Sequence, residues 1–123
     1  MNKLMTCMLS LMLCATAFAG QVKPRHTGNW WKQKSPTFRE AYVSGYKSGK
    51  HDGMGKDTNL TQLGERELVD GLDKFYTDFR NRNILFVDAI GYVADQLRGV
   101  PDDKLAAEIL RLRAASASAG AED

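Results

Sequence analysis

Two short motifs contain the residues that could carry out chemistry in this chain, and each falls short of a working site. The segment 45–50, with the sequence GYKSGK, partly matches a phosphate-binding loop. That loop needs four residues between its glycines and a hydroxyl-bearing residue after its lysine, whereas here three residues intervene and His51 follows. His51-Asp52 could begin a metal site, but metals need three or four converging ligands and the other histidine, His26, is distant in sequence. We therefore expect no metal, no cofactor and a solvated loop at 50–59.

Several carboxylates lie on one predicted helix, at spacings that are typical of a solvated surface. Asp70 and Lys74 are four residues apart, as are Asp78 and Arg82, and this is the spacing of exposed ion pairs on a helix. Catalytic carboxylate pairs instead need raised pKa values in a cleft. No nucleophile, base and orienting group can be assigned in the sequence, so we expect a protein that is not an enzyme. The acidic residues of this helix are Glu65, Glu67, Asp70, Asp73 and Asp78.

Four residues are candidates for binding a partner protein. Trp30 and Trp31 are large apolar groups outside the predicted helices, and tryptophan is enriched among the residues that dominate interface energies. The alternative is that one of the two rings folds back over the core. Asp88 and Asp95 are seven residues apart on an otherwise apolar predicted helix, so they lie nearly on one line. They either edge the core or form a polar strip that faces the partner.

The periodicity of apolar residues predicts the helices that position these groups. Ser35-Pro36 can begin the first helix, with serine as its cap and proline at its first position. Small residues at 41, 45 and 49 form a stripe that either admits a second helix or weakens the helix end. The second helix begins near Asn59 or Thr61, and Gly71 within it suits a close helix crossing. The apolar positions that define these two helices are Phe38, Tyr42, Tyr46, Leu68, Leu72, Phe75, Tyr76 and Phe79.

Two further helices complete the predicted fold. The third begins after Asn83, is apolar over more than half of its surface and ends at Gly99, so we expect it at the centre of the fold. The fourth begins at Pro101 and carries acids in its first turn and arginines near its end, as the helix dipole favours. No stretch alternates like a strand, and the chain is therefore predicted to be an all-α bundle of about four helices. The buried stripes of these two helices are Phe86, Ile90, Val93, Ala94, Leu97, Leu105, Ile109 and Leu112.

The beginning of the sequence predicts a cellular address. Residues 1–19 combine one lysine, a short apolar stretch and small residues at Ala17 and Ala19, which is the pattern of a cleavable secretory signal. The apolar stretch is too short to span a bilayer, so we expect contact with a membrane only during export. Cleavage after Ala19 would give a periplasmic or secreted bacterial protein. The remainder divides into an irregular, flexible N-terminal arm at 20–34, the helical domain at 35–113 and a disordered tail at 114–123.

Composition excludes several functions for the chain after export. Both cysteines, Cys7 and Cys14, lie in the signal, so no thiol remains for catalysis, redox chemistry or metal binding. Losing Lys3 with the signal leaves 16 of the 17 basic residues against 15 acidic ones. Nucleic-acid binding needs a clustered basic face, and the sequence shows no basic block. We therefore expect no nucleic-acid partner.

The order of several short motifs resembles one known family. The motifs are YVSGY at 42–46, Leu60-Thr61, ELV at 67–69, Tyr76, and the series Asp88-Ala89-Ile90, Val93 and Leu97. This order resembles the Tai-like immunity proteins, which protect bacteria from type VI secretion amidase effectors. The resemblance spans residues 42–97 and implies a helical protein that plugs the cleft of a cell-wall-degrading effector. Members of that family carry paired cysteines that staple the fold, and this chain has none after its signal.

The sequence thus predicts an exported domain that acts by binding another protein, in one form as an immunity-type inhibitor. Two alternatives stay open. The protein could be a small envelope enzyme or ligand carrier with an aromatic pocket between helices, lined by Tyr42, Tyr46, Phe75 and Tyr76. It could also be a cell-wall-associated structural factor that uses Trp30 and Trp31. A homodimer is a further open alternative.

Overall fold

The computed structural model describes residues 25–53 and 58–120, and most of this part of the chain is helical. The predicted signal at 1–19 with its cysteines, the first part of the predicted arm at 20–24 and the side chains of His51-Asp52 lie outside the described residues. The elements in chain order are α1 (Gly28–Lys32), α2 (Pro36–Gly53), α3 (Thr58–Thr61), α4 (Glu65–Phe75), the 3-10 helix η1 (Phe79–Asn81), α5 (Phe86–Leu97) and α6 (Asp102–Gly120).

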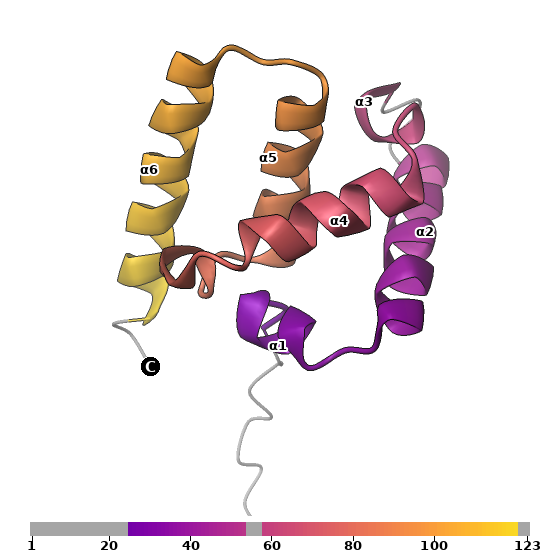
Figure 1. The fold of residues 1–123 in the computed structure, drawn as a ribbon, viewed down its shortest axis with the longest axis horizontal. Coiled ribbons are helices and arrows are strands. Elements are labelled where there is room, and N and C mark those ends of the chain that lie inside the picture. Colours follow the sequence, from indigo (N-terminus) through magenta and orange to yellow (C-terminus); the bar gives the residue numbers. More distant parts are fainter. Residues whose placement is uncertain (1–24, 54–57, 121–123) are drawn as a thin grey trace, which may run out of the picture.

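The arrangement of these helices is a small all-α fold, as the sequence predicts (Figure 1). α4 lies between α2 and α5, and α6 runs beside α5 on the side away from α2. α1 lies at the end of α2 where that helix begins. The described residues contain no strand, and their β-type pairing is an isolated bridge between Thr27 and Leu85.

The core forms where α4 and α5 cross. Gly71 permits this crossing because a Cβ atom at that position would overlap Cγ1 of Val93, which confirms the predicted close approach. α5 supplies side chains with no exposed surface, and its predicted central position is therefore confirmed. Fully burying one large aliphatic or aromatic side chain stabilises a fold by about 1.5–3 kcal/mol. The largest fully buried side chains are Trp31, Tyr76, Phe86, Leu68, Leu72, Ile84, Ile90, Val43 and Val93.

The first helix begins as the sequence predicts and ends later. The Ser35 hydroxyl accepts a hydrogen bond from the Phe38 amide at 3.2 Å, and α2 starts at Pro36. It continues to Gly53, where the sequence predicts a loop. A Cβ atom at Gly45 or Gly49 would meet no atom within 4 Å, so no helix of the described chain packs on the small-residue stripe.

The second predicted helix is divided in the structure, and its last apolar residue is not buried. α3 ends at Thr61 and α4 begins after Gly64, whose amide donates to the Glu67 carboxylate at 3.4 Å. α4 ends at Phe75, and the prediction that Phe79 belongs to the same buried stripe is wrong, because that side chain is 72% exposed. The reason is local: the Asp78 carboxylate accepts from the Arg80 amide at 3.0 Å and caps η1 in place of a continuing helix.

Both segments predicted to be irregular contain helix in the structure. The arm prediction at 20–34 is corrected over residues 28–32, which form α1. The tail prediction at 114–123 is corrected over residues 114–120, because α6 continues to Gly120. The fourth helix otherwise begins as predicted, after Gly99 with a φ of 78° and then Pro101.

Candidate functional site

A cluster of half-buried rings on α1 and α2 is the most distinctive surface feature of the described chain. We call it the aromatic face and define it as His26, Trp30, Phe38, Tyr42 and Tyr46. The i, i+4 spacing on α2 places Phe38, Tyr42 and Tyr46 on one side of that helix. Tyr42 and Tyr46 then pack edge-on against Phe86 at the start of α5, with ring centroids 4.9 and 5.2 Å apart.

The chain before α1 brings His26 onto this face. The His26 backbone oxygen accepts from the Phe86 amide at 2.7 Å, which fixes the chain against the beginning of α5. The imidazole stacks on Trp30 with centroids 4.1 Å apart, and its Nδ1 lies 2.8 Å from the Tyr42 hydroxyl. Burial raises the pKa of Tyr42, and the neighbouring Tyr46 raises it further. The rings are therefore held in one arrangement by polar contacts as well as by packing.

Part of the aromatic face is open to solvent and carries positive charge. Phe38 is 41% exposed and Trp30 is half-buried. The Lys34 ammonium lies 5.3 Å from the centroid of each of these two rings, within the range of a cation–π interaction. Rings that are rigid, partly exposed and bordered by a cation are typical of surfaces that bind proteins.

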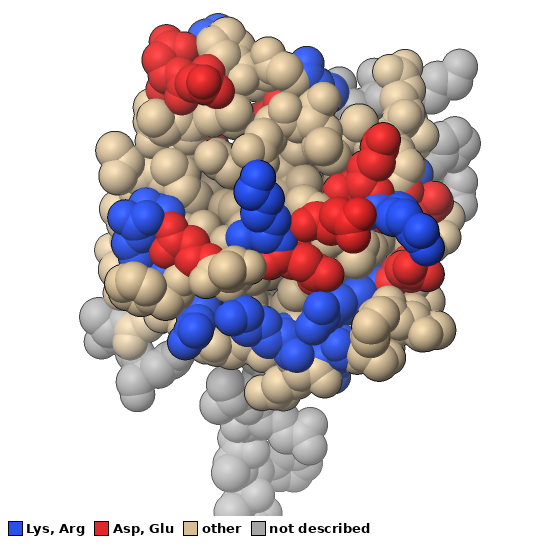
Figure 2. Space-filling view, viewed as in Figure 1, with Lys and Arg blue, Asp and Glu red and all other residues tan. Residues whose placement is uncertain are grey.

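The wider charge distribution around this face is uneven. Figure 2 shows Lys and Arg side chains gathered toward the end of the molecule where α1 lies, and acidic side chains gathered over α4. Residues 25–39 contain Arg25, Lys32, Lys34 and Arg39 and no Asp or Glu. Arg39 is partly engaged, because it donates to the Trp31 carbonyl and pairs with Asp73 at 3.0 Å. Residues 25–39, which include His26, Trp30 and Phe38 of the aromatic face, therefore have a net positive charge, and this favours a partner of opposite charge.

The structure separates the two tryptophans that the sequence suggests for partner binding. Trp30 lies on the aromatic face, whereas Trp31 is 1% exposed and stacks on Phe86 with centroids 5.6 Å apart. The Trp31 indole donates to the Asp73 carboxylate at 2.7 Å. Trp31 is thus a core residue and not a partner contact, and the alternative in which one ring folds back over the core is correct for it.

The two aspartates proposed as a polar strip have different surroundings. Asp88 is exposed in the first turn of α5 and lines a small pocket of about 100 Å³ that also contains Arg25. Asp95 is half-buried and accepts a hydrogen bond from Arg98. Neither aspartate belongs to the aromatic face.

The four residues suggested for an aromatic pocket do not form one site. Tyr42 and Tyr46 pack on Phe86, as described above. Tyr76 has no exposed surface and donates its hydroxyl to the Ile84 carbonyl at 3.1 Å, and burial raises its pKa strongly. Phe75 lines a pocket at the end of α4, and none of the other three residues lines that pocket. The predicted pocket is therefore replaced by two separate features, the aromatic face and the pocket beside Phe75.

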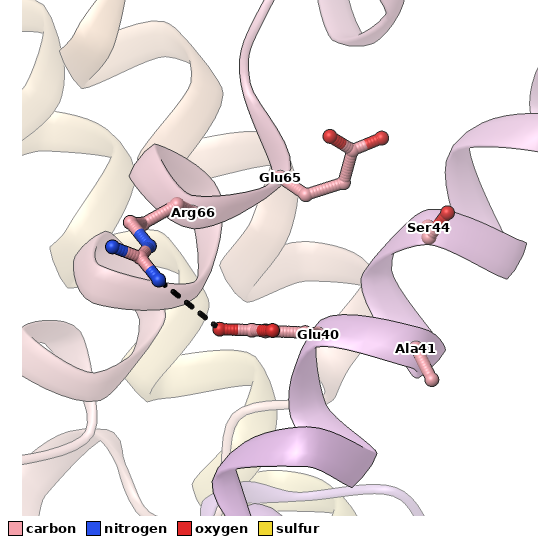
Figure 3. Close-up of a pocket in the computed structure, with 5 residues that line it drawn as sticks. All are labelled: Glu40, Ala41, Ser44, Glu65 and Arg66. Carbon is pink, nitrogen blue, oxygen red and sulfur yellow. Dashed lines mark ion pairs between the residues drawn. The ribbon is translucent and has the colours of Figure 1, made fainter.

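A shallow pocket of about 400 Å³ lies between α2 and α4 (Figure 3). Glu40 and Arg66 point toward one another across it, with 4.0 Å between the paired oxygen and nitrogen. Lys47 donates to Glu65 at 3.4 Å, and together with the Glu65 backbone amide it lowers the pKa of that carboxyl. An exposed pair such as Glu40 with Arg66 contributes about 0–1 kcal/mol. The charged groups here satisfy one another, so we assign no ligand to this pocket.

The described residues offer neither a cluster of metal ligands nor a helix that could span a membrane. No group of three or more His, Cys, Asp or Glu side chains in the described chain could hold a metal ion. Among its helices, none is long and apolar enough to cross a membrane.

Comparison with known proteins adds no assignment. No family model matches the chain, and no similar curated protein or solved structure is found. The function is therefore argued from the surface of the molecule. The sequence suggested Trp30 as a partner contact. It did not indicate His26 or Lys34 for the aromatic face, because only the fold places them beside the Trp30 ring.

Proposed function

We propose that this protein is an exported, non-enzymatic binding protein whose aromatic face docks on an acidic surface of another protein. The observation that carries the proposal is the open edge of the ring cluster, where Phe38 is 41% exposed and Lys34 borders both Phe38 and Trp30. Aromatic side chains that are already fixed lose little conformational entropy when a partner covers them. The positive surroundings of residues 25–39 would speed association with an acidic partner.

An immunity-type inhibitor of a cell-wall-degrading effector is the specific form of this proposal. The resemblance of residues 42–97 to the Tai-like proteins supports it. Inhibitors of this kind act by covering a cleft, and a rigid ring cluster bordered by lysine is a suitable group to insert into one. The role requires export, and the N-terminus of the protein recovered from the cell envelope is expected at Gly20. An intact Met1 on the envelope protein would contradict the cleavable signal.

Affinity capture with matched variants tests the docking surface. The double variant Lys34→Ala with Phe38→Ala removes the exposed edge of the aromatic face. The double variant Val87→Ala with Leu110→Ala removes side chains that are 52% and 65% exposed elsewhere. We expect the original protein and the Val87→Ala, Leu110→Ala variant to capture the same stoichiometric partner. The Lys34→Ala, Phe38→Ala variant should bind that partner at least tenfold more weakly. Equal binding by both variants would exclude the aromatic face as the docking surface, and thermal melts would show that both remain folded.

The identity of the captured material distinguishes the alternatives. A cell-wall amidase as the partner would support the immunity role. Binding to purified cell wall in place of a protein, again lost with Lys34→Ala and Phe38→Ala, would instead support the cell-wall-associated factor. The same two double variants are used for protein capture and for cell-wall binding, so the results of the two measurements can be compared directly.

A further inference from the structure

The pocket beside Phe75 lies where the end of α4 meets η1, α5 and α6. We call it the α4–α6 pocket; its volume is about 240 Å³ and it shares no residue with the aromatic face. Pockets for drug-sized ligands measure roughly 300–1,000 Å³, so this one suits a smaller molecule. Its lining is Lys74, Phe75, Asp78, Asn81, Tyr92, Gln96, Ile109 and Arg113.

The floor of the α4–α6 pocket is apolar. Phe75 is 8% exposed, and its ring centroid lies 5.3 Å from that of Tyr92. Tyr92 and Ile109 are partly buried and pack against the core. An apolar ring or short chain that entered the pocket would therefore leave water for a hydrophobic surface, at about 25 cal/mol for each Å² that it buries.

One wall of the pocket is a polar network that is fixed in place. Arg113 donates from Nε to the Asn81 side-chain oxygen at 2.8 Å and from Nη2 to the Asp78 carboxylate at 3.0 Å. Asn81 is 5% exposed and donates to the Phe75 carbonyl at 2.8 Å. The Arg80 guanidinium also donates to both Asp78 oxygens, and these hydrogen bonds hold the pKa of Asp78 far below its usual range. The one carboxylate in the pocket is thus already neutralised, while three of the five N–H donors of Arg113 remain.

The rim supplies hydrogen-bonding groups that the protein does not use. Within the described residues, the side chains of Lys74, Tyr92 and Gln96 have no hydrogen bond or ion pair to another protein group. Lys74 and Arg113 are both cationic and only Asp78 is anionic, so the lining has a net positive charge. Donors therefore exceed free acceptors, which favours an anionic ligand.

We propose that the α4–α6 pocket binds a small carboxylic acid with a compact apolar body. The carboxylate lies between Lys74 and Arg113, and the apolar body lies on Phe75, Tyr92 and Ile109. This site is independent of the docking surface proposed above. Periodicity could not locate this ligand site, because its lining residues come from α4, from η1 and its cap Asp78, from α5 and from α6.

A titration of the ¹⁵N-labelled protein with 3-phenylpropionate tests this site, followed by NMR of the backbone amides. We expect saturable shifts that are confined to residues 74–81, 92–96 and 109–113. The uncharged analogue 3-phenylpropionamide is expected to bind at least tenfold more weakly, because it cannot pair with the two cations. Equal affinity for the acid and the amide would overturn the proposal, and so would shifts that do not saturate or that spread over the whole surface.

Matched lysine variants locate the charge that matters. Lys74→Met keeps most of the side-chain length and removes the ammonium, and it is expected to weaken binding of 3-phenylpropionate about tenfold. Lys104→Met removes an exposed lysine of α6 that does not line the pocket, and its affinity is expected to match that of the original protein. Equal losses in both variants would show that general surface charge attracts the acid and would overturn the assignment of Lys74. Amide spectra of both variants report their folding in the same experiment.

Discussion

The segments 25–34 and 114–120 have similar sequences in one respect: neither shows the periodic apolar pattern of a packed helix. Both contain helix in the structure, but for opposite reasons. The first is held by contacts with distant parts of the chain, through Trp31, the bridge between Thr27 and Leu85, and Arg39, which donates to carbonyls of α1. The second is rich in alanine, which is the best helix former, and none of its residues is buried.

Helical structure by itself therefore does not show what stabilises a segment. Removing a contact should disrupt the first segment and leave the second unchanged. Removing helix propensity should have the reverse effect.

Trp31→Ala should give the largest loss of stability. The ring is 1% exposed, stacks on Phe86 and donates to Asp73, so its removal leaves a cavity and takes one hydrogen bond from the Asp73 carboxylate, which keeps its pair with Arg39. We expect a loss of about 3–5 kcal/mol in the free energy of unfolding, measured with urea. Trp30→Ala is the matched control and should lose distinctly less, because that ring is half-buried. Equal losses would show that the aromatic face is as important to the fold as the core position.

Gly28→Ala should give the next largest loss in the free energy of unfolding. A Cβ atom at Gly28 would lie 2.8 Å from Cε1 of the fully buried Tyr76 and closer still to Cδ1, so the ring would have to move. Overpacking of this kind costs about 1–3 kcal/mol. Gly45→Ala is the control within a helix, because a Cβ there meets nothing within 4 Å, and it should stabilise the protein by about 0.5–1 kcal/mol. A Gly28→Ala protein as stable as the original would mean that α1 is not tightly docked.

Local patterns in the sequence were enough to predict the all-α class, the start of α2 at Pro36 and the central position of α5. They were also enough to predict the close crossing at Gly71. Each of these depends on residue spacing or on the steric property of a single residue. Such information is complete within a few turns of the chain.

Features that depend on distant partners could not be predicted in this way. Trp31 becomes a core residue only because α4 presents Asp73 and α5 presents Phe86. His26 joins the aromatic face because its backbone pairs with α5. The expected ion pairs of Asp70 with Lys74 and of Asp78 with Arg82 are not among those of the described residues, and Asp78 pairs with Arg80 and Arg113. No local pattern in the sequence indicates that Arg113 of α6 binds Asp78 and Asn81 at η1.

The pairing of Asp78 with Arg80 and Arg113 should make stability depend on pH. Hydrogen bonds from Arg80, together with the charge of Arg113, lower the pKa of Asp78 in the folded protein. Because the folded pKa is below the unfolded value of about 3.9, this stabilisation is fully present above that value and is lost as the pH falls through the folded pKa. Asp78→Asn should therefore reduce the urea midpoint at pH 7, and the difference from the original protein should shrink below about pH 4. A difference that is constant with pH would assign the effect to the η1 cap alone.

The smallest effect on global stability is expected from Ala117→Gly, in the part of α6 that follows its last buried residue. Glycine lowers the stability of a helix interior by about 1 kcal/mol relative to alanine. If residues 114–120 open independently of the rest of the fold, their own amides should exchange hydrogen about fivefold faster. The urea midpoint should not change. Ala106→Gly is the matched control, because Ala106 is also exposed but lies next to the buried Leu105, and its cost should appear in global unfolding. Equal global losses in the two variants would show that the weak contact of Arg25 with the Ala119 carbonyl, at 3.5 Å, is enough to join this helix end to the cooperative fold.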